Sequence, residues 1–144
     1  MRFLVCVATA ISLSAVAASA DPIEDRQALM KERGAVMRIL GPIAQGREPF
    51  EADKVLEALE ELNANAQATT DVDALWPEGS DSGGDNDSAP AVWEDREGFV
   101  AATNKYAADA AAAAEAAPQD LEAFRAVFGP VASNCGSCHE AYRL

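Results

Sequence analysis

The chain has 144 residues, with 24 acidic against eleven basic side chains and a formal net charge of −13 at neutral pH. So large an acidic excess argues against nucleic acids and anionic membranes as partners, and favours a partner protein with a positive face. The length suits a single domain built around one hydrophobic core.

Residues 1–20, "MRFLVCVATAISLSAVAASA", have the layout of a cleavable secretory signal. Arg2 precedes an apolar run, and Ala18-Ser19-Ala20 forms a small-residue cleavage site. The alternative is a membrane anchor, but a spanning helix needs about 20 predominantly apolar residues and a stop-transfer pattern. We therefore predict that residues 1–20 are removed with Cys6, and that residues 21–144 form the exported domain.

Two helices are predicted in the first half of this domain. Asp21 followed by Pro22 is typical of a capped helix start, and the helix should run to about Gln45. Its apolar residues at helical spacing are Ile23, Met30, Met37, Leu40 and Ile43. The second helix fades near Thr69 and is marked by Val55, Leu56, Leu59 and Leu62. A short connection between them, punctuated by Gly46 and Pro49, makes them antiparallel neighbours.

The second half begins with a long acidic segment, residues 71–92, which contains six acidic and no basic residues. A loop of this length is usually functional or disordered. A third helix is predicted from about Trp93 through an alanine-rich run to Pro118, and a fourth from Asp120. The apolar stripe of the fourth helix is Leu121, Phe124, Phe128, Ala132 and Cys135. No segment alternates with period two, so we predict an all-α, antiparallel four-helix bundle.

The chemistry of the chain is concentrated in "CGSCH", residues 135–139, which holds the only histidine. The pattern C-x-x-C-H is typical of covalent c-type haem attachment. Residues i, i+3 and i+4 share one face of a helix. Cys135 and Cys138 can therefore each form a thioether with one haem vinyl group, while His139 becomes the proximal iron ligand.

Other interpretations of these three residues are weaker. A zinc site would need further protein ligands, and only acidic side chains remain to supply them. A thioredoxin-like dithiol normally lies beside a βαβ pattern with its reactive cysteine at a helix N-terminus. Here the pair ends the last helix of an all-helical chain. We therefore expect one covalent haem c.

Taken together, these features resemble the class II c-type cytochromes, the family of cytochrome c′ and its low-spin relatives. The resemblance covers essentially all of residues 21–144. It is carried by C-x-x-C-H with Arg143 four residues after the histidine, "RQALMKERG" at 26–34, "GPIAQGREPF" at 41–50 and Trp93. The resemblance implies a haem inside the bundle, with one face covered by the first helix.

The same resemblance assigns roles to five further residues. It implies that Arg26 and Gln27 approach the haem propionates and that Met30 faces the distal side of the iron. Trp76 matches a position where the family often has an aromatic residue near the haem, although an anchor for the acidic loop would look identical. Arg143 would lie near the haem edge, or would simply complement the helix dipole in the last turn.

The distal position separates two functions within this family. In cytochrome c′ the iron is usually five-coordinate and binds nitric oxide or carbon monoxide, whereas in the low-spin relatives a methionine sulfur closes the sixth position. Met/His ligation raises the reduction potential and suits electron transfer. A methionine on a buried helical stripe is more often core than ligand, but this chain has no second histidine. Gly34, unfavourable in a helix by about 1 kcal/mol relative to alanine, leaves room for a close approach one turn after Met30.

We therefore expect a periplasmic electron-transfer protein with His139 and Met30 as iron ligands, and keep gas binding as the alternative. No catalytic constellation is visible, and a peroxidase would need a distal acid or base that the chain lacks, so we do not expect an enzyme. The expected partners are redox proteins with a basic docking face. The resemblance also implies a possible homodimer through the first two helices, where Arg33, Arg38, Glu57 and Glu60 would equally suit solvated faces.

Overall fold

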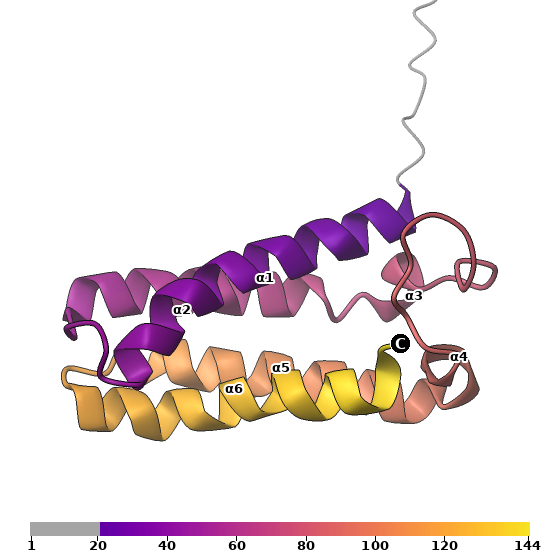
Figure 1. Cartoon of the computed structure of the whole chain (residues 1–144). Coiled ribbons are helices and arrows are strands. Elements are labelled where there is room, and N and C mark those ends of the chain that lie inside the picture. Colours follow the sequence, from indigo (N-terminus) through magenta and orange to yellow (C-terminus); the bar gives the residue numbers. More distant parts are fainter. Residues whose placement is uncertain (1–20) are drawn as a thin grey trace, which may run out of the picture.

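The structure is a computed structural model that describes residues 21–144, and the predicted signal peptide lies outside these residues. Four long helices run side by side as an antiparallel bundle (Figure 1). They are α1 (Pro22–Ala44), α2 (Ala52–Ala68), α5 (Arg96–Glu115) and α6 (Leu121–Tyr142). Two one-turn helices, α3 (Val72–Leu75) and α4 (Ala91–Glu94), lie in the connection between α2 and α5. The predicted four-helix bundle is confirmed.

Side-chain caps mark the starts of α1 and α6. Asp21 Oδ1 accepts a hydrogen bond from the Ile23 amide at 2.9 Å, with Pro22 in the first turn of α1. Asp120 Oδ1 accepts from the Ala123 amide at 2.8 Å and caps α6 in the same way. Each cap satisfies an amide that a helix start would otherwise leave without a partner. The sequence therefore predicts both starts correctly.

The third predicted helix is interrupted, which corrects the expectation of one helix from Trp93. Asp95 has φ −117° and ψ 57°, outside the helical region, and separates α4 from α5. Its carboxylate accepts from the Gly98 amide at 3.2 Å and so caps α5. The predicted loop 71–92 is likewise not wholly irregular, because it contains α3 and the start of α4.

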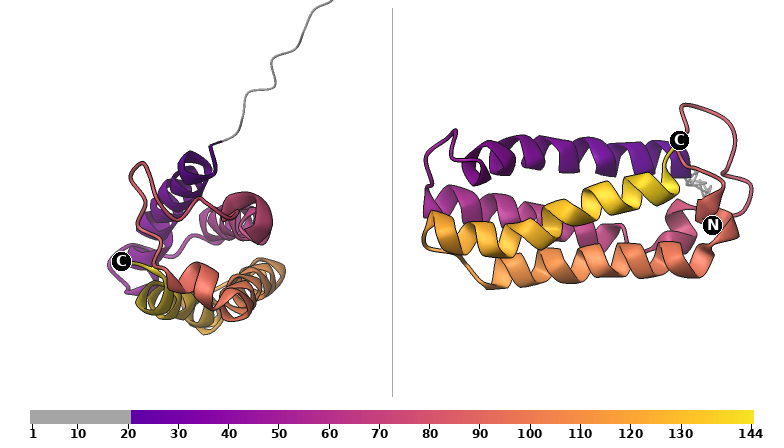
Figure 2. Two further views of the ribbon diagram at one scale, coloured as in Figure 1. Left: turned by 90° about the vertical axis from the view of Figure 1, so that its right-hand side faces the viewer. Right: turned by 60° about the horizontal axis from the view of Figure 1, so that its bottom comes forward.

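The hydrophobic core consists of two clusters at different places along the bundle. The larger lies between the four long helices and includes Leu40, Leu62 and Phe124, each 0% exposed. The smaller cluster consists of Val72, Leu75, Trp76, Val92 and Phe99. It lies toward the end of the bundle where α3, α4 and the C-terminus come together (Figures 1 and 2). Cys138 and Tyr142 of α6 pack against this smaller cluster.

The segment between α3 and α4 is held to the bundle by the last residues of the chain. The Ala89 amide donates to the Tyr142 carbonyl at 2.9 Å, and the Leu144 amide donates to the Asp87 carbonyl at 2.9 Å. Arg143 forms an ion pair with the Asp87 carboxylate at 2.9 Å. The acidic loop therefore covers the end of the bundle where the C-x-x-C-H motif lies. Among residues 21–144, no helix is long and apolar enough to cross a membrane.

Candidate functional site

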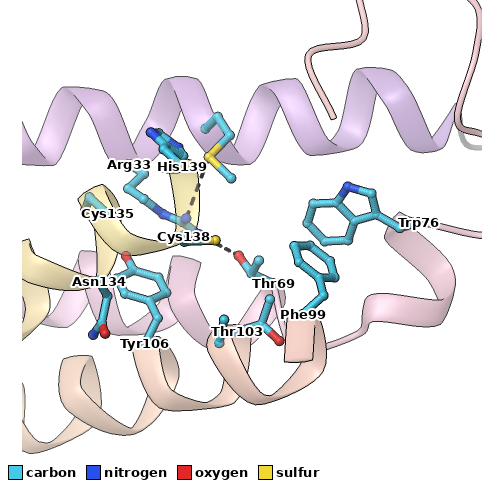
Figure 3. Close-up of a pocket in the computed structure, with 12 residues that line it drawn as sticks. Arg33, Thr69, Trp76, Phe99, Thr103, Tyr106, Asn134, Cys135, Cys138 and His139 are labelled. Carbon is cyan, nitrogen blue, oxygen red and sulfur yellow. Dashed lines mark hydrogen bonds between the residues drawn. The ribbon is translucent and has the colours of Figure 1, made fainter. Parts of the chain in front are cut away.

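A pocket opens between the long helices at the end covered by the acidic loop. Helix α6 contributes Asn134, Cys135, Cys138 and His139, and α1 contributes Met30 and Arg33 (Figure 3). The remaining lining residues come from the end of α2, the turn after α3 and the first half of α5: Thr69, Trp76, Phe99, Ala102, Thr103 and Tyr106. The pocket thus joins residues from both ends of the sequence.

The two thiols and the imidazole of the C-x-x-C-H motif line this pocket together. Cys135 and Cys138 are half-buried and neither forms a disulfide. Burial raises the pKa of both thiols, against the opposing effect of the nearby Arg33 charge. The thiols are therefore protonated at neutral pH, unlike the low-pKa thiolate of a dithiol oxidoreductase.

His139 lies on the exposed side of the pocket. Burial lowers the pKa of its imidazole, and the positive charges of Arg143 and Arg33 lower it further. A neutral imidazole keeps a nitrogen lone pair available to a metal ion. The motif therefore presents two thiols and one neutral imidazole on a single helix face.

Met30 lines the same pocket from α1, so the structure brings together the two predicted iron ligands. Its sulfur accepts a hydrogen bond from Arg33 Nη1 at 3.6 Å. Met37, one of the two other methionines, instead packs against the larger core cluster. Of the two methionines among residues 21–144, Met30 is therefore the one that lines the same pocket as His139.

Arg33 is a pocket residue that sequence reasoning missed. Its guanidinium donates from Nη2 to Thr69 Oγ1 at 2.7 Å and from Nε to Asn65 Oδ1 at 3.1 Å. It also lies 4.3 Å from the centre of the Tyr106 ring. An arginine among polar helix residues is typical of a solvated face, and the acceptors lie on a different helix. Only the position of Arg33 three residues after Met30, on the same face, was a signal for this placement.

Tyr106 contributes a buried hydroxyl to the pocket. The residue is 6% exposed, and its Oη has no hydrogen-bond partner among residues 21–144. Burial raises the pKa of Tyr106 to about 12, despite the nearby Arg33 charge. A buried hydroxyl without a partner is costly and is often found where a binding group completes the site.

Arg26 and Gln27 do not line the pocket. The four hydrogens on the two Nη atoms of Arg26 face acceptors in the loop: the Leu75 carbonyl, Ser80 Oγ, the Ser80 carbonyl and Asn86 Oδ1, at 2.9 to 3.0 Å. Gln27 Nε2 donates to the Asp85 carbonyl. Both residues therefore hold the acidic loop against α1, and the propionate contacts expected of them stay a prediction.

Of the two remaining predicted haem contacts, Trp76 lines the pocket and Arg143 does not. Trp76 is 5% exposed and lines the pocket, while its Nε1 donates to Ser88 Oγ at 3.2 Å, so the side chain serves both the pocket and the loop. Arg143 follows α6, forms its ion pair with Asp87 and is not part of the pocket lining. At Gly34, only the end of the Arg38 side chain lies near the position that a Cβ would occupy, so no neighbouring backbone makes a close approach there, and the room it would leave for the haem stays a prediction.

Comparison with known proteins identifies the family. The family model described as Cytochrome C' matches residues 21–143, nearly all of the described chain. This chain belongs to the cytochrome c′ family. It is 34% identical over 125 residues to cytochrome c-556 of Agrobacterium tumefaciens strain II Chrys. The aligned residues cover 87% of this chain and 98% of that protein.

A relative named cytochrome c′ is about as similar to this chain as the cytochrome c-556 is. Cytochrome c′ of Rhodopseudomonas palustris is 33% identical over 126 residues, covering 88% of this chain and 84% of that protein. The solved structure of cytochrome c′ from the same organism superposes with a TM-score of 0.79 at 30% identity, covering 88% of this chain and 98% of that one. The cytochrome c′ family consists of electron carriers and gas binders rather than enzymes, and each member carries one covalent haem c.

The residues of the pocket fit this haem. Cys135, Cys138 and His139 offer the two thiols and the imidazole that covalent attachment and proximal ligation require. The aromatic rings of Trp76 and Phe99 supply an apolar wall, with their centroids 4.8 Å apart in an edge-on arrangement. A donor set of this kind, in a pocket with apolar aromatic walls, matches a c-type haem.

Proposed function

We propose that this cytochrome c′ family protein transfers single electrons in the periplasm, with His139 as the proximal and Met30 as the distal ligand of its haem. The single observation that carries the proposal is that Met30 and His139 line one pocket from two different helices, α1 and α6. A haem between them would have a nitrogen ligand on one side and a sulfur ligand on the other. Such ligation raises the reduction potential and favours electron transfer.

The residues around the pocket have defined tasks in this proposal. Cys135 and Cys138 hold the haem to α6, and the neutral imidazole of His139 supplies the proximal lone pair. Trp76 and Phe99 keep water from one side of the pocket. The haem, once bound, supplies the one-electron couple itself.

Periplasmic location and a redox partner with a basic face belong to the same proposal. The secretory pattern of residues 1–20 and the cytochrome c′ family match support export. The net charge of −13 supports docking to a basic surface. Asp87 lies beside the C-terminal end of α6, and Asp81 and Asp85 belong to the same acidic loop. A homodimer through α1 and α2 stays a prediction of the family resemblance.

Gas binding is the second candidate, and one specific contact favours it. The Met30 sulfur accepts a hydrogen bond from Arg33 Nη1, and a sulfur lone pair used in this way is less available to iron. Overall identity does not distinguish the candidates, because it is 34% to a cytochrome c-556 and 33% to a cytochrome c′. In a gas-binding protein, Met30 would wall off the distal side without ligation.

Optical spectra with carbon monoxide separate the two functions. We expect the ferrous protein to show the sharp α band of a low-spin haem and to resist carbon monoxide. Met30→Ala should give a broad high-spin spectrum and bind carbon monoxide readily. Met37→Ala is the matched control, because Met37 lies on the same helix but packs against the larger core cluster. A broad spectrum with ready carbon monoxide binding in the unmodified protein would refute Met30 ligation and support gas binding.

A further inference from the structure

Arg33 is the one lysine or arginine among the described residues that line the haem pocket. The contacts of its guanidinium are all with uncharged groups. They are the side-chain oxygens of Asn65 and Thr69, the Met30 sulfur and the face of the Tyr106 ring. Figure 3 marks the contact between Arg33 and Thr69 with a dashed line, in the same pocket as Cys138 and His139 of α6. The positive charge therefore lies inside the pocket rather than on a solvated face.

The two side chains that accept hydrogen bonds from Arg33, Asn65 and Thr69, are held in place by further hydrogen bonds of their own. Asn65 is 6% exposed, and its Nδ2 donates to the Leu29 carbonyl at 2.9 Å. Thr69 is 2% exposed, and its hydroxyl donates to the Asn65 carbonyl at 2.9 Å, which turns its lone pairs toward Arg33. A guanidinium held by buried, preset acceptors loses little further freedom and stays in one position. The structure thus builds a definite place for this cation.

No carboxylate neutralises the Arg33 charge within the part of the chain that the structure describes. The ion pairs found there join Arg96 to Asp73, Lys105 to Asp109 and Arg143 to Asp87. The nearby Glu32 carboxylate accepts instead from Asn65 Nδ2 at 3.2 Å. A chain with 24 acidic residues therefore keeps one arginine unpaired inside its haem pocket.

We propose that Arg33 is a fixed internal cation that raises the reduction potential of the haem. Transfer of one electron from a donor protein converts ferric to ferrous iron and lowers the positive charge of the site by one unit. A nearby positive charge repels the ferric state more than the ferrous state, and so favours reduction. The effect is strong because charges inside a protein are weakly screened by solvent and salt.

This inference rests on the covalent haem of the cytochrome c′ family and holds whether or not Met30 ligates the iron. The two questions have separate readouts. The optical spectrum reports the iron ligands, and a redox titration reports the ferrous-to-ferric ratio. A failure of Met30 ligation would therefore leave the test of Arg33 intact.

The test compares four variants of the holoprotein in redox titrations. Arg33→Gln and Arg33→Met remove the charge, the first with a polar and the second with an apolar side chain, so that one remains usable if the other fails to fold. Arg33→Lys keeps the charge. Arg38→Gln is the matched control, because it removes the same charge from an exposed position on the same helix.

At a fixed ambient potential, Arg33→Gln and Arg33→Met should each lower the ferrous-to-ferric ratio about tenfold, which is about 59 mV for one electron. Arg33→Lys and Arg38→Gln should stay within about threefold of the unmodified protein. The Arg33 effect should also persist at high salt. The proposal is overturned if Arg33→Gln and Arg33→Met shift the ratio no more than Arg38→Gln, or if Arg33→Lys shifts it as much as Arg33→Gln. It is also overturned if the ratio shifts only in variants whose spectrum reports changed iron ligands.

Discussion

The guanidinium carbon of Arg26 lies 5.8 Å from the centre of the Trp76 ring, so α1 supports an aromatic side chain that lines the pocket with Met30 and His139. The same guanidinium binds the carbonyls of Leu75 and Ser80 on either side of the tryptophan. One buried arginine thus fixes both the loop and a wall of the pocket. The stability of this loop is a consequence of contacts made at the start of the chain's first helix.

Replacing Arg26 should therefore loosen the loop and destabilise the protein. In Arg26→Gln we expect a loss of about 2 to 3 kcal/mol, because several buried acceptors lose a charged donor. Amide hydrogens of the loop should also exchange faster. Arg47→Gln removes the same charge from an exposed residue and should cost less than about 0.5 kcal/mol. Equal effects of the two substitutions in chemical denaturation would contradict the anchoring role of Arg26.

The covalent attachment can be tested directly on the two cysteines. The double variant Cys135→Ser with Cys138→Ser should release its haem on a denaturing gel, because no thioether remains to hold it. Each single variant should keep its haem on the gel through one thioether. Ser137→Ala lies between the cysteines, is exposed, and serves as the control. Haem that stays with the double variant under denaturing conditions would show that another residue forms the attachment.

Replacing Tyr106 tests whether its buried hydroxyl has a hydrogen-bond partner. Its hydroxyl is buried without a hydrogen-bond partner among residues 21–144, so Tyr106→Phe should leave stability unchanged or raise it by about 1 kcal/mol. The optical spectrum of the variant should stay the same. A loss of more than about 1 kcal/mol in thermal or chemical unfolding would show that the hydroxyl has a partner in the haem protein.

Leu40 and Ile39 are adjacent residues of α1, and they differ in how far their side chains are exposed. Leu40 is 0% exposed and Ile39 is 38% exposed. Leu40→Ala should cost about 2 to 5 kcal/mol, because it leaves a cavity in the larger core cluster. Ile39→Ala should cost less than about 1 kcal/mol, since its side chain is already partly in water. Similar losses for the two variants in urea unfolding would contradict the helix orientation on which the pocket depends.

The stability of the α5–α6 contact should depend on pH through Asp109. Hydrogen bonds from Lys105 and Asn134 lower the pKa of this carboxyl. A pKa that is lower in the folded than in the unfolded protein contributes stability above the unfolded value, and this contribution disappears as pH falls through the folded value. The difference in unfolding free energy between the unmodified protein and Asp109→Asn should therefore shrink between about pH 6 and about pH 3. A difference that stays constant or grows on acidification would contradict this assignment.

The sequence predicts the features that depend on local order along the chain. The Asp21 and Asp120 caps, the spacing of apolar residues in α1 and α2, and the C-x-x-C-H face of α6 all arise from residues within one or two turns of each other. They were therefore accessible without the structure.

Features that depend on distant partners were not accessible in this way. Arg33 finds its acceptors Asn65 and Thr69 more than 30 positions away, and Arg26 finds Ser80 and Asn86 in a loop more than 50 positions away. The break at Asp95 was missed because helix propensity alone does not show that a carboxylate will cap the next turn. Each failure thus concerns a polar side chain whose role is set by tertiary contacts.

In the proposed electron carrier, Met30 and His139 ligate one iron. The methionine–iron charge-transfer band of the ferric protein reports this ligation. We predict that the unmodified protein and Met37→Ala show this band and that Met30→Ala lacks it. A ferric protein without the band, or a band that persists in Met30→Ala, would contradict the claim.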